Sequence, residues 1–158
     1  STLAPPTRSS PASPIPKNCQ LLDAGQDCAV PGVPASLQSS TRKRADWRAR
    51  VAAAAVARWP VEEPALEIPL ALTMAFLHTG EPLDVDNMLK PTLDALKGIA
   101  YDDDARLDQV VGLRHDLSQG FRVTRLSPVL ARALVDLGGG PFVYLQLSAP
   151  THLEELLR

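Results

Sequence analysis

The stretch "LDVDNMLKPTLDALKGIAYDDDARL", residues 83–107, places six aspartates and two lysines around a helical pattern. Leu89, Leu93 and Leu96 recur at spacings of four and three, which predicts a helix with these leucines on its buried face. Gly98 follows the last of them and is a natural stop. Pro91 is compatible with a helix only near its beginning, so the helix is expected to start a few residues before this proline.

Two of the aspartates flank the expected start of this helix. Asp84 and Asp86 are separated by one residue. In extended backbone such positions face the same way, so both carboxylates can meet one ion. Hard divalent cations such as Mg²⁺ prefer carboxylate oxygens together with water and substrate phosphate. Asp86 or Asn87 is also expected to cap the helix. The aspartate pair is therefore a candidate metal site.

Lys90 follows Asp86 by four residues and therefore lies on about the same face of the helix. A lysine there can hold a phosphate or stabilise charge on a leaving oxygen. Asp94 lies four residues further on and can pair with Lys90, which would fix its position. The alternative is an ordinary helix whose exposed charges form i,i+4 pairs, and the spacing alone does not choose between the two.

A second acidic group, Asp102, Asp103 and Asp104, precedes the next predicted strand. A third carboxylate from this group would complete a metal site, while a solvated acidic turn is the alternative for the group taken alone. Asp102 is interpreted as such a turn residue. A calcium-binding EF-hand loop is excluded, because Leu89 and Ala95 stand where that loop requires glycine and glutamate.

The segment before this stretch contains a helix and a strand. Residues 41–58 are rich in alanine and arginine, which favours a helix with Trp47, Val51 and Ala54 on one face. Residues 66–77 are predicted to form a strand. Pro69 indicates that this strand lies at an edge of the sheet or starts irregularly.

The segment after the stretch continues the alternation. Residues 107–117 are predicted as a strand, and a turn follows at 118–120. Residues 128–137 are predicted as a helix with Ser127 as its cap. Residues 141–149 close the chain as a strand. This order predicts an α/β (α+β) fold with a small mixed β-sheet packed with helices.

The beginning of the chain has a different composition. Residues 1–40 are rich in proline and serine, so this N-terminal segment is expected to be partly disordered. Within it, "CQLLDAG" and "CAVPGV" are candidates for a short strand. Residues 41–158 are expected to form one domain.

Charge is distributed unevenly, although the net charge is only −2. Residues 41–58 hold six basic side chains and one aspartate, whereas residues 61–104 hold ten acids and two lysines. A basic helix beside an acidic centre suits an anionic ligand with a divalent cation, and solvated surface charge is the alternative. No apolar run has the length of a membrane span, and no signal-peptide pattern is found. No contact with membranes and a cytoplasmic location are therefore expected.

Between residues 84 and 106 the chain contains, in order, "DVDNMLK", "LDAL", "G" and "YDDDAR". This series resembles the core motif of the RusA family of Holliday-junction resolvases, which is approximately Asp-x-Asp-Asn-x-x-Lys, an apolar-Asp-Ala-Leu segment, glycine, an aromatic residue and Asp-Asp-x-Gln. Arg106 stands where glutamine is usual. The resemblance implies a mixed α/β fold, an intertwined homodimer and Mg²⁺-dependent nicking of four-way DNA junctions.

Carried over by position, the resemblance makes Asp84 and Asp86 metal-binding catalytic residues and Lys90 the catalytic lysine. Asp104 becomes the third metal carboxylate, with Asp103 as the fallback. Mg²⁺ is the expected ion, with Mn²⁺ as a substitute. Contacts with DNA phosphates are expected from the basic helix, through Arg42, Lys43, Arg44, Arg48 and Arg50.

The leading hypothesis is a structure-selective endodeoxyribonuclease that resolves Holliday junctions by paired symmetric nicks in DNA recombination and repair. A non-catalytic branched-DNA-binding module of the same fold and a small metal-dependent nucleotide phosphohydrolase are the alternatives. Tyr101 is interpreted as an anchor for the loop before the acids, and Trp47 as a residue of the core or of a dimer interface.

Overall fold

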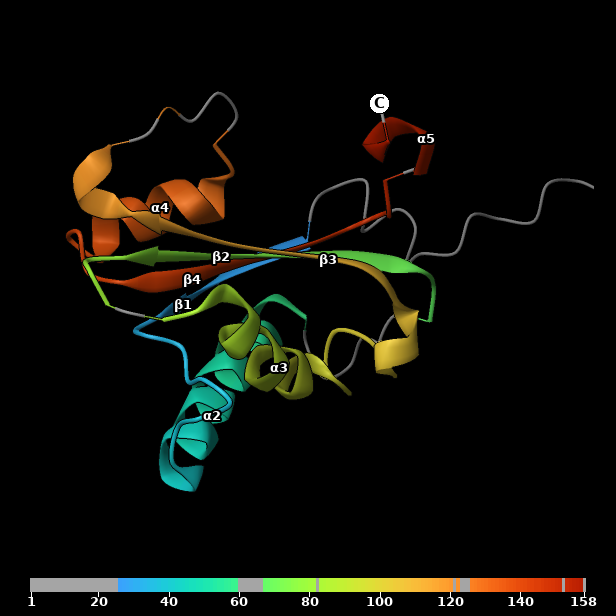
Figure 1. The fold of residues 1–158 in the computed structure, drawn as a ribbon, viewed down its shortest axis with the longest axis horizontal. Coiled ribbons are helices and arrows are strands. Elements are labelled where there is room, and N and C mark those ends of the chain that lie inside the picture. The colour runs from blue at the N-terminus through green and yellow to red at the C-terminus, as the bar shows by residue number, and fades with distance from the viewer. Residues whose placement is uncertain are drawn as a thin grey trace, which may run out of the picture.

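The computed structural model describes residues 26–59, 67–81, 83–120, 122, 126–151 and 153–157. Four strands form one sheet in the order β1–β4–β2–β3 (Figure 1). Strand β4 runs antiparallel to both β1 and β2, while β2 and β3 are parallel. The sheet is therefore mixed, which confirms the predicted fold class. The bounds are β1 Gln26–Pro31, β2 Leu70–His78, β3 Leu107–Asp116 and β4 Phe142–Ser148.

Helices cover both faces of this sheet. Helices α2 (Thr41–Arg58) and α3 (Val85–Leu96) pack on one face, and α4 (Pro128–Asp136) packs on the other (Figure 1). Two short 3-10 turns, η1 (Asp104–Arg106) and η2 (Leu117–Gln119), flank β3, and α5 (Leu153–Leu156) follows β4. The predicted order of three helices and three strands is confirmed. The structure adds helix α5 to this order, and it also contains strand β1 where a short strand was a candidate.

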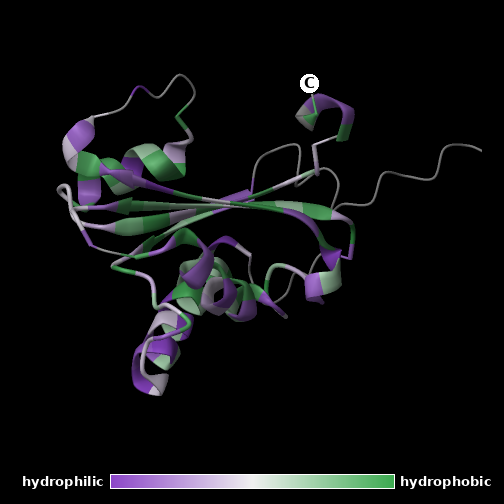
Figure 2. Cartoon of the chain, in the orientation of Figure 1, coloured by the Kyte–Doolittle hydropathy of each residue, from purple (hydrophilic) through white to green (hydrophobic). Residues whose placement is uncertain are grey.

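The alternation of side chains along the strands divides the core into two clusters. Val143, Leu145 and Leu147 of β4 point toward α2 and α3, whereas Phe142 and Tyr144 point toward α4. Strands β2 and β4 are accordingly apolar along most of their length, whereas α2 contains many hydrophilic residues (Figure 2). Because both faces are covered, β2 and β4 are buried almost continuously.

Strand β2 lies between β4 and β3 and is thus an interior strand. Pro69 immediately precedes it, and the pairing with β3 shifts register between Leu70 and Ala71. Of the two explanations offered for this proline, the irregular start is therefore correct and the edge position is wrong. The proline is tolerated because it lies outside the regular ladder.

Helix α3 buries a different face from the one predicted. Its buried residues are Met88, Pro91, Thr92, Ala95 and Leu96, so of the three predicted leucines only Leu96 is fully buried. Leu89 and Leu93 are half-buried and pack at the margin of the core. The buried face includes Thr92 because its hydroxyl accepts a hydrogen bond from Trp47 of α2 at 3.0 Å.

Strand β1 belongs to the proline-rich beginning of the chain. It contains the "CAVP" part of the predicted short strand, and Cys28 and Val30 are buried in the core. The other candidate, "CQLLDAG" at residues 19–25, lies outside the described residues. Residues 26–31 thus form the edge strand next to β4.

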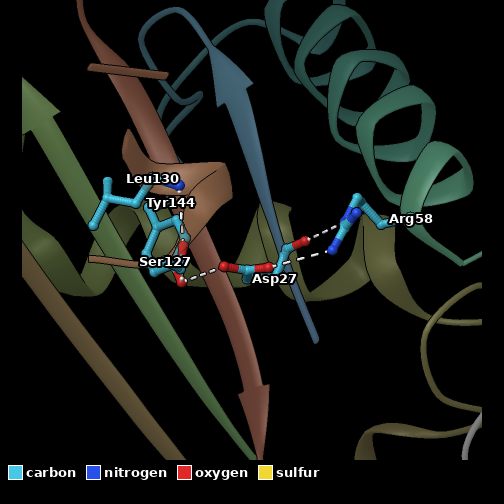
Figure 3. A network of polar contacts seen from close by, with 5 residues as sticks. All are labelled: Asp27, Arg58, Ser127, Leu130 and Tyr144. Carbon is cyan, nitrogen blue, oxygen red and sulfur yellow. Dashed lines mark hydrogen bonds and ion pairs between the residues drawn. The ribbon is translucent and has the colours of Figure 1, made fainter. Parts of the chain in front are cut away.

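A buried polar network connects β1 with the helices on both faces of the sheet (Figure 3). The Tyr144 hydroxyl donates to Asp27 Oδ2 at 2.6 Å and lies 3.3 Å from Ser127 Oγ, which caps α4. On the other side, Arg58 at the end of α2 donates through Nε to the Asp27 carbonyl at 2.9 Å. Burial, followed by the Asp27 charge, raises the pKa of the adjacent Cys28 to about 12. This thiol is therefore not a nucleophile at neutral pH.

Candidate active site

The beginning of α3 carries the two aspartates predicted as metal ligands. Asp84 is the N-cap residue, with extended backbone and no capping hydrogen bond from its side chain, and Asp86 lies in the first turn. Both residues are exposed. Because the helix begins at Val85, the two side chains do not share one face of an extended segment, as the sequence argument assumed. The expectation that Asp86 or Asn87 caps the helix is wrong, because Asp84 holds that position.

Lys90 lies one turn beyond Asp86, with its ammonium group between two other carboxylates. Its Nζ donates to Asp94 Oδ1 at 2.7 Å and lies 3.6 Å from Asp104 Oδ2. The predicted pairing of Lys90 with Asp94 is thus confirmed. The hydrogen bond that Lys90 donates to Asp94, and then the charges of Asp94 and Asp104, raise the pKa of Lys90 above its ordinary value. The ammonium group therefore keeps its proton at neutral and mildly alkaline pH.

The three acids after α3 have three different partners. Asp102 accepts two hydrogen bonds from Arg106, at 2.9 and 3.1 Å, and this partner lowers the pKa of Asp102. Asp103 Oδ1 accepts from the Ala105 amide at 3.0 Å and so caps η1. Asp104 is the member of the group that contacts Lys90. The interpretation of Asp102 as a merely solvated residue is thus incomplete, because it fixes Arg106.

Asp104 is the carboxylate that best fits an additional ligand. Its Oδ1 atom is buried and has no hydrogen-bond partner within the described residues. A buried carboxylate oxygen without a partner is unfavourable, and a hard cation would satisfy it. Across the described ranges, however, no three acidic, histidine or cysteine side chains are close enough to hold a metal ion. In the structure Asp104 lies next to Lys90, whereas Asp84 and Asp86 lie at the N-terminal start of α3.

Two aromatic residues fix α3 and the loop that follows it. The buried Tyr101 donates its hydroxyl hydrogen to the Leu93 carbonyl at 2.7 Å, which confirms its interpretation as an anchor for the acidic loop. Trp47 is a core residue of α2, and its Nε1 donates to Thr92 Oγ1 at 3.0 Å. Because the Thr92 hydroxyl also donates to the Met88 carbonyl, the two helices are joined by a continuous buried chain of hydrogen bonds.

Two residues of β3 that the sequence argument did not single out hold the start of α3 in place. A Cβ atom at Gly112 would lie 2.7 Å from Val85 Cγ1 and 3.1 Å from a methyl carbon of Leu89. Arg114 Nη1 donates to the Leu83 carbonyl at 2.6 Å, directly before Asp84. A glycine within a strand often marks such a close approach, so Gly112 was the available signal. The local sequence around Arg114 gave no indication of its contact with Leu83.

The five residues of α2 that were predicted to contact DNA do not line one common cavity. Arg44 and Arg48 line a cavity that also contains Asp94. Lys43 and Arg50 line a different cavity, which lies toward Glu81 and Leu83. Arg42 is exposed and lines neither cavity. The helix therefore places two of its cations beside the Lys90–Asp94 pair.

A lysine among carboxylates, next to a basic helix, is an arrangement suited to cleaving a phosphodiester. The family model described as endodeoxyribonuclease RusA matches residues 37–123, which is more than half of the chain. The chain belongs to the RusA endodeoxyribonuclease family. Membership supports, in general terms, an endonuclease that resolves Holliday junctions and requires a divalent metal.

The matched segment spans α2, β2, α3, η1 and β3, and so it contains every residue of the candidate site. No curated protein matches the chain. None of the described helices is long and apolar enough to cross a membrane.

Proposed function

We propose that this chain is a Mg²⁺-dependent resolvase that cleaves four-way DNA junctions by paired symmetric nicks, as a homodimer. The observation that carries the proposal is the position of Lys90. Its ammonium group lies between the carboxylates of Asp94 and Asp104, and it belongs to the helix that has Asp84 as its N-cap and Asp86 in its first turn. This arrangement combines a fixed cation with exposed carboxylates, within the segment that matches the nuclease family.

Three carboxylates are proposed to hold the metal: Asp84, Asp86 and Asp104, with Asp103 as the alternative to Asp104. The unpaired buried oxygen of Asp104 supports this assignment. These residues would hold Mg²⁺, or Mn²⁺ in its place, and the bound ion would supply water activation and neutralisation of charge on the phosphate. Asp84 and Asp86 are exposed and have no side-chain partner among the described residues, so their side chains can turn toward Asp104 when an ion binds.

Lys90 is proposed to stabilise the negative charge that develops on the scissile phosphate. A charged group stabilises the transition state most when its position is fixed before the reaction. Asp94 supplies that position through the 2.7 Å hydrogen bond. The raised pKa of Lys90 keeps it cationic over the pH range in which nucleases work. Lys90 is thus the proposed catalytic cation and Asp94 its positioning residue.

A homodimer fits the two-fold symmetry of a four-way junction, because each of two sites would cut one of two equivalent strands. Strand β3 supports a contact between copies. It is a ten-residue edge strand, and it exposes Val110, Val111 and Leu113. An exposed apolar edge strand is suited to pairing with another chain. Sedimentation of the purified protein would measure the oligomeric state directly.

Cleavage of defined DNA substrates tests the proposal. The purified protein is incubated with a synthetic four-way junction, a fork and a linear duplex, each with and without Mg²⁺. Symmetric nicking of the junction that requires Mg²⁺ is expected. Asp86→Asn should abolish nicking while junction binding survives, because the phosphate contacts lie on α2. Metal-stimulated hydrolysis of free nucleotides without junction preference, or junction binding with no cleavage by the parent protein, would contradict it.

A further inference from the structure

A cavity of about 300 Å³ lies between α2 and α3. It is formed by one face of α2, by part of α3 and by the loop before α2, through Leu37, Thr41, Arg44, Ala45, Arg48, Pro91 and Asp94. The α2 residues are spaced by three, one and three, as expected for neighbours on one helix face. Because Asp94 also binds Lys90, the cavity adjoins the proposed reaction site.

Pro91 explains why Leu37 lies beside this cavity. Proline has no amide hydrogen, so the carbonyl of Asn87, four residues earlier, lacks its usual helical partner. The Leu37 amide donates to this carbonyl instead, at 3.0 Å. The hydrogen bond ties the loop before α2 to the first turn of α3. The proline within the helix thus creates the anchor that holds Leu37 at the rim of the cavity.

Among the described residues, the two arginines of the cavity have no acidic partner. Neither Arg44 nor Arg48 forms a side-chain hydrogen bond or ion pair within the described residues. They are four residues apart, where like charges repel each other on a helix surface. Asp94, the one acid among the described residues that line the cavity, already forms an ion pair with Lys90 at 2.7 Å. An anion bound between the two arginines would relieve their repulsion.

We infer that this cavity binds a backbone phosphate of the DNA strand, adjacent to the phosphate that is cleaved, with Arg44 and Arg48 as its donors. The inference rests on the proposed function. Arginine suits this role because its planar group of N–H donors matches the oxygens of a phosphate. The strand would then run from the cavity past Asp94 to Lys90, which fixes its register at the reaction site.

The same geometry separates these two arginines from their neighbours on α2. Lys43 and Arg50 line the other cavity together with Asp46 and Glu81. Two carboxylates there oppose the binding of a phosphate. Arg50 is therefore a comparison residue of equal charge on the same helix, and its loss should weaken DNA binding less than the loss of Arg44 or Arg48.

The salt dependence of binding tests the inference. Each variant is made in the Asp86→Asn protein and kept free of divalent metal to prevent cleavage, and binding to a labelled four-way junction is measured over a series of salt concentrations. Arg44→Gln and Arg48→Gln should each reduce the slope of log K against log[salt] by about 1, the loss of one phosphate contact. Arg132→Gln, on α4 at the opposite face of the sheet, is the control and should leave the slope unchanged. Equal slopes for Arg44→Gln, Arg48→Gln and Arg132→Gln would overturn the inference.

A chemical substitution in the DNA locates the bound phosphate. Single neutral methylphosphonate linkages are placed at successive positions on either side of the cut. For the parent protein, one linkage next to the cut should weaken binding markedly. For the Arg44→Gln/Arg48→Gln variant the same linkage should have no further effect, because its partners are already absent. If that linkage weakens binding equally in both proteins, the phosphate lies elsewhere.

These measurements distinguish failure of the inference from failure of the proposed function. The parent protein could cleave the junction while the arginine variants show unchanged salt slopes. That result would contradict the phosphate site and would still support the resolvase proposal. A parent protein that neither binds nor cleaves the junction would remove both.

Discussion

Lys90 is the residue on which the proposed chemistry most depends, because it is the cation that the carboxylates of α3 and η1 hold in place. The sequence predicted its contact with Asp94 from a spacing of four residues, and the structure confirms it. The contact with Asp104 could not be predicted in this way, because it depends on the path of the chain after α3.

Replacing Lys90 should therefore affect catalysis more than binding. Lys90→Met is expected to lower the rate of junction cleavage by about 100- to 1,000-fold, the usual cost of removing one fixed stabilising group. Single-turnover cleavage assays with saturating protein would measure the effect. Lys97→Met is the matched control, since Lys97 is an exposed lysine at the other end of the same helix. An equal fall in the cleavage rate of both variants would indicate that the rate depends on total positive charge and not on the position of Lys90.

Asp94 should control the protonation of Lys90. Its hydrogen bond is the main cause of the raised pKa of Lys90, so the folded protein holds this proton to higher pH than a free lysine does. Asp94→Asn should lower the pKa, and Lys90 should then lose its proton at lower pH. A titration of the Lys90 side-chain carbon by NMR, in the absence of DNA, would follow this directly. Asp136→Asn, which removes the distant partner of Arg132, should leave the Lys90 titration unchanged.

At the scale of elements, the start of α3 is positioned by β3. The parallel pairing of β2 and β3 requires a crossover, and α3 provides it. Gly112 permits the close approach of Val85 and Leu89, and Arg114 holds the Leu83 carbonyl. The aspartates at the helix start therefore depend on residues that are close to them in space and distant in the chain.

Gly112→Ala should displace that helix start. The added Cβ would lie 2.7 Å from Val85 Cγ1, so α3 must shift away from β3. Weaker Mg²⁺ binding and slower cleavage are expected, together with a loss of stability of about 1–3 kcal/mol from overpacking. Calorimetric titration with Mg²⁺ and urea unfolding would measure the two effects. Gly138→Ala is a control for added bulk away from the site, because a Cβ there meets no atom within 4 Å, although its φ of 56° makes some strain intrinsic. If metal affinity falls equally in both variants, β3 does not position the site.

At the scale of the whole molecule, the Asp27 network joins the helices on the two faces of the sheet through the edge strand β1 (Figure 3). Asp27 is only 5% exposed, so its carboxylate depends on the Tyr144 hydroxyl and on Arg58. Burial, followed by the hydrogen bond to Asp27, raises the pKa of Tyr144 to about 12. The hydroxyl thus remains a donor throughout the neutral pH range.

Removing this donor should destabilise the fold. Tyr144→Phe leaves a buried carboxylate oxygen without its 2.6 Å partner, and the free energy of unfolding should fall by about 1–3 kcal/mol. Urea unfolding would measure it. In an Asp27→Asn background the cost of the same change should be smaller, because the charge that needs the donor is gone. An equal cost in both backgrounds would mean that the hydroxyl does not act through Asp27.

Local sequence was enough to predict most of the helices and strands and to propose the site residues. Helices α2 and α4, strands β3 and β4, and the pairing of Lys90 with Asp94 follow from periodicity, capping residues and spacing, which act over a few neighbouring positions. The aspartates and the lysine were likewise assigned by their order in the chain, and their roles remain predictions.

Only the tertiary structure decided which residues meet across the molecule. The interior position of β2, the buried face of α3, the contact of Asp104 with Lys90 and the cavity of Arg44 and Arg48 depend on how distant segments pack. How these segments pack depends on the shapes of their side chains and on the hydrogen-bond partners that their buried polar groups require. The Asn87 carbonyl left free by Pro91, and satisfied by Leu37, is one such case. Such contacts join residues far apart in the chain, and local patterns carry no information about them.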